Sequence, residues 1–397
     1  MKVLFQNFDP GSGGGISNIL LMLQAYCRTF PRDVLLVLCP ACSLLTSLSA
    51  FPNVQVHQAP ASWPREAYRL YWGFGGLSRF LDRTKVDVVW SMNIGPYVRS
   101  GTPQVLSLHN AYQVCPFEYT RFHPKNRAWV SALRWFFRRS MARSDGAIVQ
   151  TNLMRDYALQ FRRGPRKVVV IPKAVDSDRD VPAEQLPGEI LRALQNEPEE
   201  DCPTFLYAAT NEPHKNHKTV ASAVEILRHR GRSVRLVFTI GEGELIAAAG
   251  ADAKSLIESG HIVPLGWVGK EHLKSLYDTC NLCVMPSLLE SLSSAYLEAM
   301  MWSRPQICSD LPFARDVCGD AAIYARPGDP EDWANQMEHL LDDVELQRKL
   351  IALGQRRMQL WPKSWVEVAR SVRSFLSEVS QQHEAADMRQ SIERIEA

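Results

Sequence analysis

A chain of 397 residues is longer than one hydrophobic core usually organises, so we expect two domains. With 46% hydrophobic and 22% charged residues, the composition is that of a globular protein and excludes a disordered chain. The net charge is only +2, but residues 1–180 carry 23 Lys and Arg against 11 Asp and Glu, whereas residues 181–397 carry 22 against 32. The basic first half is therefore suited to an anionic partner.

The sequence has no apolar run near the roughly 20 residues that a membrane span needs. The opening stretch MKVLFQNFDPGSGGG reaches Asp9 and a glycine run too early for a signal peptide. We therefore expect a cytoplasmic protein. Its nine cysteines are scattered and odd in number, which argues against a secreted disulfide framework.

In the first half, short apolar runs alternate with helical stretches. The run KVLF is followed by glycines and a helix, and later strand-like runs are DVLLVL, VQVH, VDVVW, QVLSL, GAIVQ and KVVVIP. Such alternation is typical of β-α-β units and a parallel sheet. We expect residues 1–178 to form one doubly wound α/β domain.

An acid- and proline-rich stretch over 179–203 reads as a linker. The alternation then restarts with TFLYAA, VRLVFTIG, HIVPLG, NLCVMPS, PQICSD and AAIYA, which predicts a second doubly wound domain over 204–362. A helix over 363–380 should pack back toward the first domain, and the polar residues 381–397 should form a frayed tail. Two such domains would face each other across a cleft at the carboxyl ends of their strands.

Glycines in GSGGGIS, residues 11–17, lie between the first expected strand and helix. They would let backbone N–H groups approach a phosphate at a helix N-terminus, although a tight turn alone would use the same residues. The dinucleotide fingerprint G-x-G-x-x-G fails, because its third glycine would fall on Ile16 or Asn18.

Lysines follow the first strand of the second domain. Lys215 and Lys218, in NEPHKNHKTV, precede an apolar-periodic helix. A lysine there can reach a diphosphate as a point charge, or it can be a solvated surface residue.

Two acids stand eight residues apart in SLLESLSSAYLEAMMWSRP, residues 287–305. Glu290 falls in the turn after a buried strand, and Glu298 falls about one turn inside a helix that begins at serines. An anionic diphosphate could rest on the serine N–H groups, with the two carboxylates accepting hydrogen bonds from sugar hydroxyls. Alternatively, one acid favours the helix dipole and the other lies on a solvated face.

Two Cys-x2-Cys pairs, Cys39/Cys42 and Cys280/Cys283, could form a zinc site or a redox couple. Each pair lies in or beside an apolar strand-like run, where cysteine serves as a small buried hydrophobe. We therefore interpret them as structural.

At this point the chain resembles a known family. The segments EPHKN, TIGEGE, PLGWV and MPSLLESLSSAYLEAMMWSRP resemble, in that order, the second domain of retaining glycosyltransferases of family 4. The glycine turn, LHN, VVVIPKAVD and WPKSWVEVA also fit, so the resemblance covers nearly the whole chain. It implies the GT-B architecture, with two Rossmann-like domains, and a nucleotide sugar as donor substrate.

By this resemblance, the E-x7-E pair of the family corresponds to Glu290 and Glu298. Glu290 would contact the transferred sugar, Glu298 the ribose hydroxyls and Lys215 the diphosphate. The family also binds the donor through its glycine turn and through the backbone after the first glutamate. These donor-binding positions are Gly14, Gly15, Leu292, Ser293 and Ser294.

His109, in SLHNAY, matches a histidine that lines the catalytic cleft of the family, where it would hydrogen-bond the donor sugar or assist the acceptor hydroxyl. A lone histidine after a strand is otherwise most often structural. The chain departs from the family at Ala209 and Thr210, where an arginine for the diphosphate often stands, and at Ser291 and Ser293, which replace glycines. Because of these departures, the identity of the donor sugar cannot be carried over from the family.

The resemblance implies a hexosyl transfer with retention, in which the departing diphosphate helps to deprotonate the acceptor. The Asp-x-Asp patterns at 176–180 fall where the first domain passes into the linker and are interpreted as solvated acids, so we expect neither a metal nor another cofactor. The acceptor would be a saccharide or a lipid-linked saccharide, in surface polysaccharide or lipopolysaccharide synthesis.

Residues 121–144 carry seven Lys and Arg and no acid, interleaved with aromatic residues. Such a helix can lie on an anionic membrane, here at its inner face, or bury its apolar side in the first domain. Nucleic acid is not expected as a partner, because no recognition motif accompanies the charge.

Two rival functions stay open. A sugar-nucleotide epimerase or phosphorylase can use the same two-domain fold, and a catalytically silent subunit could bind the sugar nucleotide without turning it over. A transferase forms a new glycoside on an acceptor, whereas an epimerase needs no acceptor. Glu290→Ala should greatly reduce the turnover of a transferase but leave a silent binding role intact.

Overall fold

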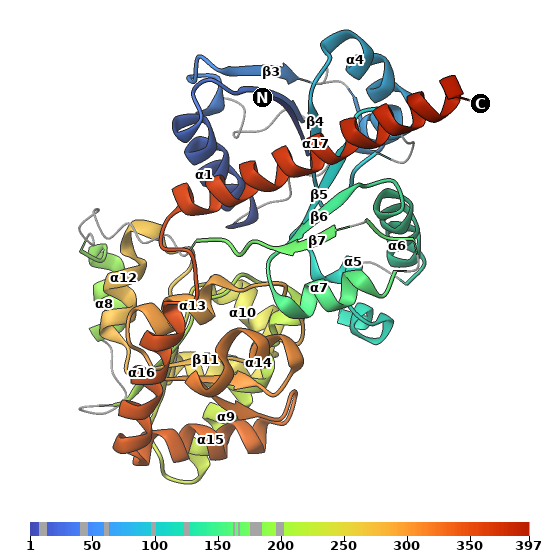
Figure 1. The fold of residues 1–397 in the computed structure, drawn as a ribbon. Coiled ribbons are helices and arrows are strands. Elements are labelled where there is room, and N and C mark those ends of the chain that lie inside the picture. The colour runs from blue at the N-terminus through green and yellow to red at the C-terminus, as the bar shows by residue number, and fades with distance from the viewer. Residues whose placement is uncertain are drawn as a thin grey trace. The chain divides into compact units, whose positions relative to one another are not determined.

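The computed structural model describes residues 1–7, 14–39, 47–58, 63–96, 101–122, 127–161, 163–165, 167–174, 185–195 and 202–396. The chain divides into two compact units (Figure 1). Unit 1 comprises Met1–Phe117, Lys125–Asp176 and Pro362–Ala397, and unit 2 comprises Glu118–Pro124 and Ser177–Trp361. Glycines 11–13, Cys42 and the acids at 176–180 lie outside the described residues.

Unit 1 is built on a seven-stranded sheet with the order β3-β2-β1-β4-β5-β6-β7. Every described strand pair in it is parallel. The central strands are apolar on both faces, as expected where helices cover both sides of a sheet. All seven runs predicted from the sequence are strands: β1 Lys2–Asn7, β2 Val34–Cys39, β3 Val54–Gln58, β4 Val88–Met92, β5 Gln104–Leu108, β6 Gly146–Val149 and β7 Lys167–Val170.

The helices of unit 1 lie on both faces of this sheet. On one face, α1 (Gly14–Thr29) and α17 (Trp365–Glu396) pack on alternate strand residues such as Val3 and Phe5. On the other, Leu4 and its equivalents contact a second set of helices. That set includes α3 Arg65–Tyr71, the π-helix η1 Trp72–Gly76, α4 Leu77–Thr84 and α6 Arg127–Met141. Shorter elements are α5 Ala111–Val114 and α7 Asn152–Leu159. The 3-10 helix η2 Phe117–Phe122 starts at the last residue of this part of unit 1 and otherwise belongs to unit 2.

Unit 2 repeats the pattern with six parallel strands in the order β10-β9-β8-β11-β12-β13. The strands are again those predicted: β8 Thr204–Tyr207, β9 Arg235–Phe238, β10 Ile262–Pro264, β11 Leu282–Met285, β12 Gln306–Ser309 and β13 Ile323–Ala325. Its helices are α8 Gly188–Gln195, η3 Pro213–Lys215, α9 His217–His229, α10 Glu242–Ala249, α11 Asp252–Glu258, α12 Lys270–Thr279, α13 Ser294–Met301, α14 Pro312–Cys318, η4 Gly319–Ala321, α15 Pro330–Asp342 and α16 Val344–Met358.

Two segments differ from the sequence expectation. The stretch expected to be a linker contains α8, which buries Ile190 and Leu194 and whose Leu194 carbonyl accepts a hydrogen bond from the Arg235 guanidinium. The C-terminal helix does not stop at 380, because α17 continues through Glu396 instead of leaving a frayed tail. Among the described residues, no helix combines the length and the apolar character needed to span a bilayer.

Candidate functional site

The site in unit 2 forms where the strand order reverses. The chain leaves β8 toward β9 on one side, and β11 pairs with β8 on the other. The loops after β8 and β11 therefore depart in opposite directions from one edge of the sheet, which is where open α/β sheets bind ligands. Lys215 stands in η3 after β8, and Glu290 stands in the loop after β11.

Lys215 and Glu290 form an ion pair at this point. Lys215 Nζ lies 2.6 Å from Glu290 Oε1, and the two side chains are only 14% and 10% exposed. Lys215 and the first acid of the E-x7-E segment, 75 residues apart in the chain, therefore meet in the fold, which agrees with the family resemblance.

The charge on Glu290 is fixed by its neighbours. Burial would raise the pKa of this carboxyl, but Lys215 and His214, together with hydrogen bonds from Lys215 and Ser287, outweigh burial and hold the pKa below its usual value. Glu290 is therefore an anion at neutral pH, and its negative charge is compensated by the lysine.

Backbone and hydroxyl contacts join the two loops into one structure. The Tyr207 hydroxyl donates to the Lys215 carbonyl at 2.7 Å and lies 3.2 Å from Ser287 Oγ. The Leu288 N–H donates to the His214 carbonyl at 2.7 Å, and the Asn216 amide donates to the Pro286 carbonyl at 3.2 Å. The ion pair is thus held from both sides. Neither Tyr207 nor Ser287 stands out in the sequence as a site residue.

The helix that follows, α13, presents its N-terminus beside this pair. Ser293 is the N-cap residue in extended backbone conformation and Ser294 is the first helical residue, while Leu292 is buried. Within the described part of the chain, the Ser293 hydroxyl makes no capping bond to the helix. Backbone N–H groups at a helix N-terminus form a natural anion site.

Glu298 lies in α13 and is oriented by a tyrosine that the sequence analysis did not single out. The Tyr277 hydroxyl, from α12, donates to Glu298 Oε2 at 3.2 Å. The Tyr277 ring packs on Trp302 at 4.6 Å between centroids. Because Tyr277 is buried, with a pKa raised by burial and by Glu298, it stays a hydroxyl donor at every physiological pH. The carboxylate of Glu298 is therefore held at a defined angle.

The remaining predicted residues belong to unit 1. Gly14 and Gly15 open α1 after β1. His109 follows β5, and its backbone N–H donates to Asn93 Oδ1 at 2.8 Å. Burial, and then the nearby charge of Lys173, lower the pKa of His109 to about 4. At neutral pH the imidazole is thus uncharged, which is the form that can exchange a proton or accept a hydrogen bond.

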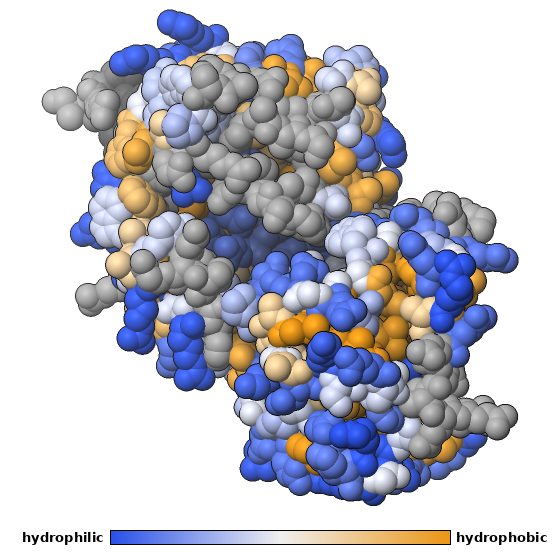
Figure 2. All heavy atoms as spheres, turned by 180° about the vertical axis from the view of Figure 1, so that it is seen from behind, coloured by the Kyte–Doolittle hydropathy of each residue, from blue (hydrophilic) through white to orange (hydrophobic). Residues whose placement is uncertain are grey.

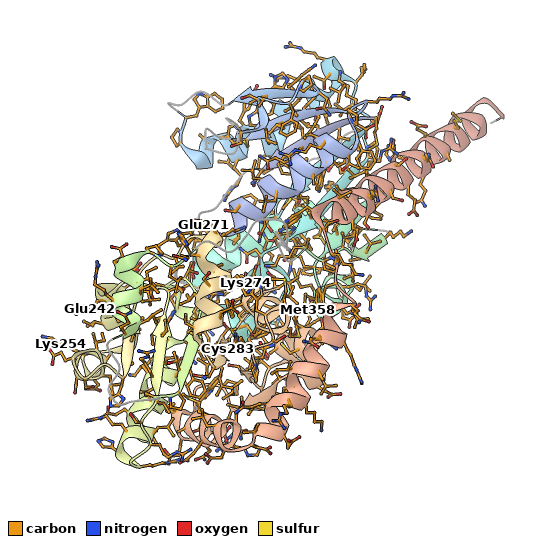
Figure 3. The ribbon with its side chains drawn as sticks, turned by 90° about the vertical axis from the view of Figure 1, so that its left-hand side faces the viewer. Glu242, Lys254, Glu271, Lys274, Cys283 and Met358 are labelled. Atoms are coloured by element: carbon orange, nitrogen blue, oxygen red, sulfur yellow. The ribbon has the colours of Figure 1, made fainter. Side chains whose placement is uncertain are left out.

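The cysteine interpretation is confirmed where the structure describes it. Cys39, Cys280 and Cys283 are buried. Figure 3 shows Cys283 inside unit 2, whereas Glu271 and Lys274 lie on α12. Burial raises the pKa of Cys280 to about 11, so its thiol is protonated and a weak nucleophile.

Comparison with known proteins agrees with this arrangement. The sequence model of "Glycosyl transferases group 1" matches residues 192–357, and that of "Glycosyltransferase Family 4" matches residues 13–179. A glycosyltransferase from Rickettsia africae ESF-5 superposes with a TM-score of 0.70 at 13% identity, covering 95% of this chain and 98% of that one. Anabaena Alr3699/HepE in complex with UDP gives 0.66 at 15% identity, covering 95% and 100%.

The fold is thus that of the GT-B glycosyltransferases, with two Rossmann-like parallel-sheet domains. The chain belongs to the group 1 glycosyltransferases of family 4, whose two sequence models together cover most of it.

Among curated proteins, the putative glycosyltransferase EpsD of Bacillus subtilis (strain 168) is 28% identical over 53% of this chain and 54% of its own length. The O-antigen chain mannosyltransferase B of Escherichia coli is 26% identical over 58% and 60%. The chain therefore spans little more than half the length of these relatives.

Proposed function

We propose that this protein is a retaining hexosyltransferase that moves a sugar from a nucleoside diphosphate sugar to a saccharide or lipid-linked saccharide in surface polysaccharide synthesis. The observation that carries the proposal is the buried Lys215–Glu290 pair beside the N-terminus of α13. It joins a cation and a helix N-terminus, which suit a diphosphate, to a carboxylate that suits sugar hydroxyls. The O-antigen mannosyltransferase among its relatives supports the polysaccharide assignment.

In the proposed reaction, the diphosphate leaves as the bond from the anomeric carbon to the phosphate oxygen breaks. The negative charge that develops on the phosphate oxygens would be stabilised by Lys215 and by the N–H groups of Ser293 and Ser294, and fixed donors of this kind lower the barrier. The acceptor oxygen bonds to the same face of the anomeric carbon, and its proton passes to the departing phosphate. Configuration is therefore retained.

The other residues position the donor. Glu290 would accept hydrogen bonds from the hexosyl group, Glu298 from the ribose, and the backbone at Leu292 would border the sugar. In unit 1, Gly14 and Gly15 would bind the diphosphate through their N–H groups. The neutral imidazole of His109 would hydrogen-bond the sugar or the acceptor hydroxyl.

Lys215 and the α13 N-terminus would neutralise the diphosphate, so we propose that the reaction requires no metal. Turnover that survives EDTA supports this, and turnover restored only by Mg²⁺ or Mn²⁺ contradicts it. We also propose that the protein works at the inner membrane face, where the basic segment 121–144 would meet anionic lipid.

The assay that tests the function incubates the protein with labelled UDP-, GDP- and dTDP-sugars and a saccharide acceptor extract. A labelled glycoside of retained configuration is the expected product, and Glu290→Ala should reduce its rate by about a thousandfold or more. Conversion of the sugar nucleotide without an acceptor would indicate an epimerase instead. Tight donor binding with no turnover would indicate a silent binding subunit.

A further inference from the structure

Helix α3 and the π-helix η1 carry an apolar stripe that is exposed to solvent and is not part of the hydrophobic core. Ala67, Leu70, Tyr71 and Phe74 recur at the i, i+3, i+4, i+7 spacing of one helix face. The three large side chains are 46%, 44% and 43% exposed. A surface helix normally turns such a stripe inward, so this one is available to a partner.

The buried side of the same segment is filled by other residues. Tyr68, Leu77 and Leu81 are nearly inaccessible and pack with Leu4 and Val89 of the sheet. The segment therefore has two apolar sides: one packs in the core, and the other is exposed to solvent.

Aromatic packing holds the exposed stripe in place. The rings of Trp63 and Tyr71 meet edge to face with centroids 5.2 Å apart, and Tyr71 meets Trp72 at 5.1 Å. Gly76, in the π-helical turn, permits this, because a Cβ there would overlap the Tyr71 ring. The π-helix, a rare form that often marks functional sites, thus leaves space for the ring of Tyr71, the last residue of α3.

Helix α6 adjoins the same face of the sheet. Its Leu133 and Phe136 belong to the hydrophobic cluster that holds Tyr68 and Trp72. The alternative in which α6 buries its apolar side is the one that the structure shows, since Val130 and Phe137 are inaccessible.

The outer side of α6 is nevertheless aromatic and basic. Trp129 and Trp135 stay 42% and 54% exposed. Arg127 and Arg138 are exposed as well, Arg139 stacks over the Trp135 ring, and the helix contains no acid. Figure 2 shows, on the face drawn there, hydrophobic residues at the surface among hydrophilic ones.

We infer that this aromatic face of unit 1, formed by Trp63, Leu70, Tyr71, Phe74, Trp129 and Trp135, docks on an anionic lipid bilayer. Trp and Tyr favour the boundary between lipid headgroups and acyl chains, and the arginines of α6 complement anionic headgroups. A second copy of the chain fits less well, because a two-fold contact would oppose the arginines of both copies. The inference deepens the proposed function, since a lipid-linked acceptor would be met at this surface.

Co-sedimentation of the full chain with phosphatidylcholine vesicles, with and without phosphatidylglycerol, tests this inference. The protein should bind the anionic vesicles, and the triple variant Leu70→Ser/Tyr71→Ser/Phe74→Ser should weaken binding by about a hundredfold, since three inserted side chains are lost. The matched control is Val344→Ser/Leu360→Ser, which removes exposed apolar residues of unit 2 and should bind like the parent. Phe74→Trp should bind at least as tightly as the parent.

The two parts of the surface should respond differently to salt. Arg127→Gln/Arg138→Gln should abolish most of the salt dependence of binding, whereas the serine variant should keep that dependence at lower affinity. Equal binding by the parent and the serine variant overturns the inference. So does an absence of vesicle binding together with a concentration-dependent dimer that the serine variant dissolves, which would make the surface a protein interface.

Donor binding by the same variants separates this inference from the proposed function. Calorimetry with UDP- and GDP-sugars should be unaffected by the serine variant, because Leu70, Tyr71 and Phe74 are not among the residues proposed to bind the donor. Vesicle binding without any donor binding would refute the transferase proposal alone. Donor binding and transfer without vesicle binding would refute the lipid surface alone.

Discussion

Lys215 Nζ and Glu290 Oε1 lie 2.6 Å apart, and each side chain is largely buried by the protein around it. Removing one partner of a buried ion pair leaves an uncompensated charge, whereas removing both leaves none. The single variant Lys215→Met should therefore lose about 3 kcal/mol of unfolding free energy. The double variant Lys215→Met/Glu290→Gln should recover most of that loss while donor binding stays abolished.

Urea unfolding and donor calorimetry on the same preparations check this prediction. Lys215→Arg is the control, because it keeps the charge and should keep the fold. Donor affinity that survives in the double variant would mean that the pair is structural and that the diphosphate binds elsewhere.

Tyr207 supports the site through its hydroxyl alone. Tyr207→Phe removes the donor to the Lys215 carbonyl and the contact with Ser287, so the loops after β8 and β11 lose a shared bond. We expect turnover to fall by about tenfold and stability by about 1 kcal/mol.

The chain offers a matched control for this variant. Tyr324→Phe also removes a hydroxyl that donates to a backbone carbonyl, that of Gly319, in the same unit. It should show a similar stability loss with normal turnover. Equal effects on turnover in both variants would remove any special role for Tyr207.

Tyr277→Phe tests the orientation of Glu298. Without the hydroxyl bond at 3.2 Å, the carboxylate gains rotamers and must be ordered when the ribose binds. Affinity for the nucleoside diphosphate should fall by about tenfold, with little change in turnover at saturating donor. A calorimetric titration with UDP and GDP measures it, and affinity equal to that of the parent would place the ribose elsewhere.

Stability should depend on pH through a buried histidine of unit 2. Burial, then Lys215 and His214, lower the pKa of His217 from 6.5 to about 4. Between pH 6.5 and about 4, His217 is protonated in the unfolded chain but not in the native protein. The free energy of unfolding therefore decreases as the pH falls through this range. The loss should reach about 3 kcal/mol at the acid end of this window.

His217→Phe should flatten this part of the profile, because a phenyl ring packs against Tyr207 and Phe238 without titrating. Urea unfolding at pH 5 and 7.5 provides the comparison. His109, whose pKa is lowered in the same direction, should leave a residual slope in that variant. A profile identical to that of the parent would show that His217 is not the group responsible.

The sequence predicted the strands well because each is a compact apolar run bounded by turn residues. The resemblance to the family assigned Lys215 and Glu290 to one donor site, and the structure brings the two side chains together where the strand order reverses. The sequence could not reveal Tyr207, Ser287 or Tyr277, because these hydroxyls act through neighbours distant in the chain.

Sequence periodicity was also insufficient for the helices at the surface of unit 1. The stripe on α3 looks like an ordinary core stripe, and only the burial of Tyr68 and Leu77 shows that the core is filled without it. The end of α17 was placed too early for a similar reason, because polar residues can continue a helix that is anchored elsewhere.

That anchoring of α17 bears on the order in which the chain assembles. Val368, Val372 and Leu376 complete the core beside α1, and Arg373 bonds to Asp33 at 3.1 Å. On the ribosome, unit 2 is synthesised in full before the residues of α17 are added. Unit 2 can therefore fold while the hydrophobic core of unit 1 still lacks this helix. The N-terminal half should thus be the last to become resistant to protease during synthesis, in contrast to the usual order in multidomain chains.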